Sequence, residues 1–88
     1  MDEILEAIQK LSKALVLINQ NPIDYETVRD LVKGLADEKH TDYIEQGIAN
    51  QDKGLIMRGL MGTLSRYEAE REKNAKEKTL QNLKKAIE

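Results

Sequence analysis

The sequence predicts an all-α protein, a small bundle of four to five helices with a charged and possibly extended C-terminal helix. The composition is rich in Leu, Ile, Ala, Glu, Lys and Gln and contains no Phe or Trp, a bias that favours helix over sheet. Apolar residues recur at spacings of three and four, and no segment shows the alternation typical of a strand. The length of 88 residues suits one domain with one modest core.

The first helix is expected over residues 2–19. Its apolar positions form one stripe, which comprises Ile4, Ile8, Leu11, Leu15 and Ile18. Asp2 and Glu3 suit the positive end of the helix dipole. Pro22 disfavours helical geometry in the residue before it, so the segment 19–22 should end this helix.

The second helix is expected over residues 23–38. Its cap is either Asn21, with Pro22 at the first helical position, or Asp24. The predicted core stripe comprises Tyr25, Val28, Leu31, Val32 and Leu35.

A turn over residues 37–41 and a short third helix over residues 42–51 follow. Asp42 and Glu45 have the spacing of a capping box at the start of that helix.

The fourth helix should begin near Lys53, with Asp52 as its cap. One face carries Ile56, Met57, Leu60, Met61, Leu64 and Tyr67. We expect this face to pack on the first and second helices, so that these three helices form the main body.

Residues 68–78 differ from the rest of the chain, because eight of the eleven are charged. This stretch is either a solvated continuation of the helix, held by pairs such as Glu72 and Lys76, or a frayed linker. We therefore divide the chain into a bundle core, residues 1–68, and a charged C-terminal helix or tail, residues 69–88.

The tail ends in an amphipathic stripe made by Leu80, Leu83 and Ile87. Such a stripe can dock on its own bundle, pair with a second copy or enter the groove of a partner. It is the first of two predicted partner-binding surfaces.

The second predicted surface is a strip of small residues on the fourth helix, which comprises Gly59, Gly62, Ser65 and Ala69 and is flanked by Arg58 and Arg66. Glycine costs a helix interior about 0.8–1 kcal/mol relative to alanine, and small residues let another helix approach closely. The strip either faces a partner or lies in solvent and tolerates glycine. If it faces a partner, alanine at both glycines should raise thermal stability and weaken association.

The charge changes sign along the chain. Residues 1–52 hold five Lys and Arg against eleven Asp and Glu, a formal net charge of −6, whereas residues 53–88 hold nine against five, a net charge of +4. The halves can attract one another, a second copy or a charged partner. The basic half also allows contact with nucleic acid, although interleaved glutamates and the scarcity of aromatic residues make that the weaker reading.

Several chemistries find no support in the sequence. The chain has no cysteine and no phosphate-binding, nucleophile-elbow or metal-helix motif. His40, the one histidine, stands among Asp37, Glu38 and Asp42 in a polar segment where carboxylates usually serve as caps. We therefore expect no enzyme activity, no cofactor, no metal and no catalytic residue.

The leading functional prediction is a cytoplasmic, non-enzymatic protein-interaction module that binds another protein and inhibits, protects or chaperones it. Inhibitors, phage antagonists, secretion chaperones and immunity proteins are built from small helical chains of this kind. The alternatives are a nucleic-acid-binding regulator that uses the basic surface of the fourth helix, and a homodimeric assembly protein. The longest apolar run, residues 14–18, is too short to span a membrane.

Overall fold

The protein is an all-α bundle, as the sequence predicts. The computed structural model describes residues 2–87, and their side chains as far as residue 85. Within that part of the chain there are four helices and no strand: α1 (Glu3–Leu17), α2 (Tyr25–Val32), α3 (Glu38–Ala49) and α4 (Lys53–Ile87).

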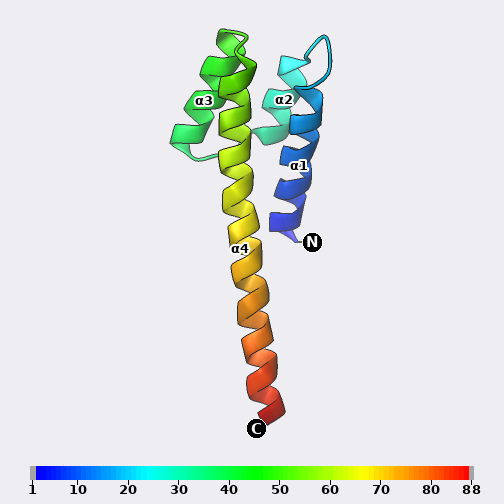
Figure 1. Ribbon diagram of the computed structural model, residues 1–88, viewed down its shortest axis with the longest axis vertical. Helices are drawn as coiled ribbons and strands as arrows, with labels where there is room; N and C mark the ends of the chain where they lie inside the picture. Colours follow the sequence, from blue (N-terminus) through cyan, green and yellow to red (C-terminus); the bar gives the residue numbers. More distant parts are fainter. Residues whose placement is uncertain (1, 88) are drawn as a thin grey trace.

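Helix α4 forms the long axis of the molecule, whose extents are 58 × 22 × 18 Å (Figure 1). α1 runs antiparallel to the first half of α4 on one side, and α3 packs on the other side. α2 packs mainly on α1. The prediction that the fourth helix packs on the first two is right for α1 and wrong for α2, whose place beside α4 is taken by α3.

An aspartate caps the start of every described helix. Its carboxylate accepts backbone N–H groups that have no partner within the first turn. The caps are Asp2 for α1, Asp24 for α2, Asp37 for α3 and Asp52 for α4. Asp24 is therefore the cap of α2 among the two candidates.

The start of α3 corrects the sequence interpretation. Asp37 accepts the backbone N–H of His40 at 2.8 Å, and α3 begins at Glu38. The residues predicted to form a turn thus make the first turn of α3, and Asp42 lies inside the helix instead of capping it.

Two backbone positions with positive φ accompany helix ends. α2 ends at Val32, six residues before the predicted end, and Gly34 just beyond it has a φ of +79°. Glycine adopts this left-handed conformation without the steric cost of a Cβ. α3 ends at Ala49, and Gln51 follows with a φ of 52°.

The core is built from α1, α2, α3 and the first half of α4. Its buried members are Leu11, Ala14, Ile18, Val28, Val32, Ile44, Ile56 and Leu60. The predicted stripes supply most of them, but Met61 was wrongly included, because its side chain is 52% exposed. Thr63 is buried instead, and its hydroxyl donates to the carbonyl of Gly59 at 2.8 Å.

Helix α4 continues without a break through the charged stretch, so the solvated-helix alternative holds and the frayed linker does not. The stretch is made mostly of Ala, Glu, Arg and Lys, which are good helix formers. The Glu72 carboxylate also pairs with the Lys76 ammonium at 3.3 Å. Every described side chain from Glu68 to Lys85 is exposed.

Candidate interaction surface on α4

The end of α4 presents large apolar side chains to solvent. Leu80 is 61% exposed and Leu83 is 55% exposed. The third predicted member of this stripe, Ile87, has its side chain outside the described residues. α4 continues past the foot of the bundle, so Leu80 and Leu83 do not dock on their own bundle.

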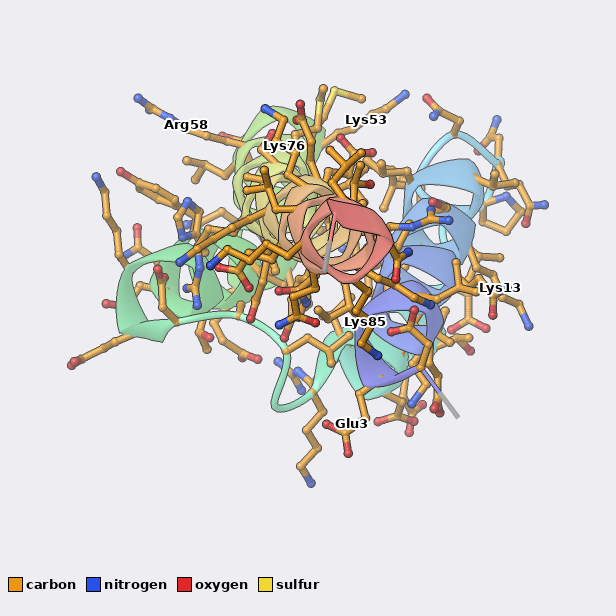
Figure 2. All side chains as sticks on the ribbon, turned by 90° about the horizontal axis from the view of Figure 1, so that it is seen from below. Glu3, Lys13, Lys53, Arg58, Lys76 and Lys85 are labelled. Atoms are coloured by element: carbon orange, nitrogen blue, oxygen red, sulfur yellow. The ribbon has the colours of Figure 1, made fainter. Side chains whose placement is uncertain are left out.

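These leucines also lie on the side of α4 opposite to the residues that it buries in the bundle. At about 100° per residue, Leu80 lies about 160° around the helix from the buried Leu60. In the view along α4, Lys76 and Lys85 extend to opposite sides of the helix, and Lys76 and Arg58 lie on the side that α1 and α3 leave uncovered (Figure 2). The leucine stripe belongs to this uncovered side.

We define the open face of α4 by seven residues: Met61, Ser65, Glu68, Glu72, Lys76, Leu80 and Leu83. They fall within an arc of about 120° around the helix, and all seven are exposed. A shallow, mainly apolar depression beside Leu80 is lined in part by Ala75 and Thr79. The open face therefore runs from the bundle to the tail as one accessible strip.

The residues of the predicted small-residue strip have different surroundings: the two glycines face α3, and Ser65 faces solvent. A Cβ on Gly59 would lie 2.6 Å from Cγ1 of Ile44 and 2.9 Å from the carbonyl oxygen of His40, and a Cβ on Gly62 would meet the His40 ring. The close helix approach predicted for the two glycines is thus made by α3 of the same chain and not by a partner. Ser65 is exposed and belongs to the open face.

The two arginines near this strip also contact α3. The guanidinium of Arg58 lies 5.2 Å from the centre of the Tyr43 ring, within range of a cation–π interaction. Arg66 donates to the Asp37 carboxylate at 3.0 Å. Arg58 is nevertheless exposed and can contribute to a binding surface.

The segment around His40 is a capping arrangement. His40 Nδ1 lies 2.7 Å from Asp37 Oδ1, and the His40 ring meets Tyr43 edge to face at 6.1 Å between centroids. Among the described residues, no group of three or more His, Cys, Asp or Glu side chains is arranged to hold a metal ion.

Two capping carboxylates titrate below their ordinary range. The backbone N–H of His40, followed by the His40 side chain, lowers the pKa of Asp37, and Arg66 adds a smaller effect in the same direction. The hydroxyl of Thr27, followed by its backbone N–H, lowers the pKa of Asp24. In both cases the hydrogen bonds favour the charged carboxylate.

A hollow of about 190 Å³ lies between α2 and α3. Its apolar lining includes Val32 and Ile44, and at its rim Arg29 pairs with Glu45 at 2.8 Å. This pair joins α2 to α3 beside the hollow.

None of the helices in residues 2–87 combines the length and the apolar character needed to cross a membrane. Comparisons of the chain with protein families, with curated proteins and with solved structures found no match.

Proposed function

We propose that this protein is a non-enzymatic interaction module that binds another protein through α4 and thereby inhibits, protects or chaperones it. The observation that carries this proposal is the exposure of Leu80 and Leu83 on the open face, at the end of a helix that projects from the bundle. We place this activity in the cytoplasm, which the lack of cysteine suits.

The grouping of apolar side chains supports the proposal. Single exposed apolar residues are normal on soluble proteins, whereas grouped ones mark binding surfaces. Four large hydrophobic side chains are strongly exposed within the described part of the chain, and three of them, Met61, Leu80 and Leu83, lie on the open face. An amphipathic helix of this kind enters grooves on partner proteins through residues spaced by three and four.

The test compares proteins cross-linked in the source cell to the wild-type chain and to a Leu80→Gln/Leu83→Gln variant. The control is Gln81→Ala, which changes an exposed residue about 100° around the helix from Leu80. We expect a protein other than this chain to be recovered with the wild type and the control and to be lost with the double variant. Equal recovery of every protein with all three chains would refute the proposal.

The lysines of the tail support a second candidate, a nucleic-acid-binding regulator. Residues 73–85 contain Lys73, Lys76, Lys78, Lys84 and Lys85 but only one acidic residue, Glu77. Contacts with phosphates would make binding fall steeply with added salt. A titration of labelled DNA and RNA at low and high salt tests this candidate, which fails if neither binds at low salt.

A further inference from the structure

We propose that the open face of α4 binds the open face of a second copy of this chain, with the two helices antiparallel and the two-fold axis at the level of Glu72. This inference rests on the proposed function, because the surface proposed to bind another protein is the same surface that binds the second copy. A two-fold axis makes the interface self-complementary, so each contact below occurs twice.

The apolar residues of the open face fit this register. An axis at the level of Glu72 brings Met61 of one copy level with Leu83 of the other, since each lies eleven residues from the axis. Leu80 comes level with Leu64, which is half-buried and borders the open face. Met61 and Leu83 each lie about 20° around α4 from Glu72 and are covered by this pairing, whereas Leu80, about 80° from Glu72, lies at the edge of the interface.

Small residues lie on either side of the charged positions near the axis. Ser65 of one copy lies level with Thr79 of the other, and Ala69 lies level with Ala75. These short side chains leave room beside them for the longer side chains of Glu68, Glu72 and Lys76. Neither α1 nor α3 covers Ser65 or Ala69, which are both exposed.

The charges favour the antiparallel arrangement over the parallel one. In the antiparallel pair, Glu68 of one copy lies level with Lys76 of the other. The axis also brings Glu72 of one copy beside Glu72 of the other, which is one contact of like charges against two contacts between Glu68 and Lys76. A parallel pair would instead bring like charges together at all three positions, Glu68, Glu72 and Lys76.

The expected dimer is weak. The face from residue 61 to residue 83 is about 33 Å long and about 10 Å wide, so the two copies together bury roughly 660 Å². This area is below the usual range for stable complexes and suits a transient interface. We therefore expect dissociation in the micromolar range and weakening with salt.

Single cysteines test the register, because the natural chain has none. With a short bismaleimide, we expect Glu72→Cys to cross-link to itself and an equal mixture of Met61→Cys and Leu83→Cys to cross-link between the two variants. Leu83→Cys alone should stay uncross-linked, since the antiparallel pair separates its two copies by about 33 Å. Asn74→Cys is the control, since it lies near the axis but on the other side of α4.

Light-scattering mass at rising protein concentration provides the second readout. We expect the mass to rise from the 10.0 kDa of one chain toward twice that value. Leu80→Gln/Leu83→Gln should weaken the association by more than about tenfold, and Gln81→Ala should leave it unchanged.

Three outcomes would overturn this inference. A monomer at every concentration, efficient cross-linking of Leu83→Cys alone, or equal cross-linking of Asn74→Cys and Glu72→Cys would each exclude the antiparallel pair. None of these outcomes touches the proposed function, which depends on recovery of a different protein by the same open face.

Discussion

Gly62 lies directly against the imidazole ring of His40, and a Cβ at residue 62 would collide with Nε2 and Cδ2 of that ring. One turn earlier, Gly59 makes a similar approach to Ile44. These two glycines let α3 and α4 pack closely, so their helix-propensity cost is offset by packing within the chain.

Gly59→Ala should destabilise the protein, contrary to the gain expected from the sequence. Alanine adds about 0.8–1 kcal/mol of helix propensity. Its Cβ would lie 2.9 Å from a backbone carbonyl oxygen, which cannot rotate away as a flexible side chain can. Overpacking of this kind costs about 1–3 kcal/mol, so we expect a net loss in urea unfolding of about 1 kcal/mol.

Gly54→Ala is the matched control for that change. It lies in the same helix, and its Cβ would approach only a side-chain oxygen of Asp52, at 3.3 Å. The substitution should leave stability within about 0.5 kcal/mol of the wild type or raise it. Equal destabilisation by both alanines would contradict the close packing of α3 on α4.

Leu60→Ala and Leu80→Ala make the same chemical change at two positions of α4. Leu60 is fully buried, so its truncation should lower the free energy of unfolding by about 2–5 kcal/mol. Leu80 is 61% exposed, and its truncation should cost less than about 0.5 kcal/mol. Denaturant titration at low protein concentration separates this difference from any effect of association, and similar losses would show that the tail packs on the bundle.

Tyr67→Phe should loosen the connection between α4 and the segment that follows α2. The Tyr67 hydroxyl donates to the carbonyl of Leu35 at 2.9 Å. Removing the hydroxyl should cost about 0.5–1.5 kcal/mol in thermal or denaturant unfolding. Faster amide hydrogen exchange near Leu35 would be the local sign, and unchanged exchange there would argue against this hydrogen bond.

Asp37→Asn should reduce the loss of unfolding free energy that occurs when the pH is lowered. Because the folded state lowers the pKa of Asp37 below 3.8, its charged form stabilises the fold above that value. This contribution is lost as the pH falls through the lowered pKa. Unfolding titrations at about pH 6 and about pH 2 should therefore show a smaller loss for the variant than for the wild type. Equal losses for the variant and the wild type would show that the charge of Asp37 does not stabilise the fold.

Much of the fold was predictable because its causes are local. The spacing of residues such as Leu11, Ile18 and Leu60 defines helix faces without knowledge of their neighbours. The caps at Asp24 and Asp52 also depend only on residues a few positions away.

The role of α3 was harder to predict because it depends on contacts between distant residues. The sequence gives α3 few large apolar residues, and its importance comes from the fit of Gly59 and Gly62 against Ile44 and His40. The spacing of the small residues along α4 correctly predicted that another helix packs closely against the two glycines. It could not show whether that helix belongs to the same chain or to a partner. The exposure of Met61 likewise depends on which side of α4 the other helices occupy.

The length of α4 determines how this protein behaves in scattering and hydrodynamic measurements. Its radius of gyration over Cα atoms is 16.2 Å, whereas a globular chain of this size would have about 12 Å. A single copy should therefore elute from a gel-filtration column ahead of globular proteins of equal mass. Antiparallel pairing about Glu72 would lengthen the particle by only about 6 Å, because each tail fills the space beside the other copy's bundle. In small-angle X-ray scattering, the forward intensity per unit of protein should double while the maximum dimension hardly changes.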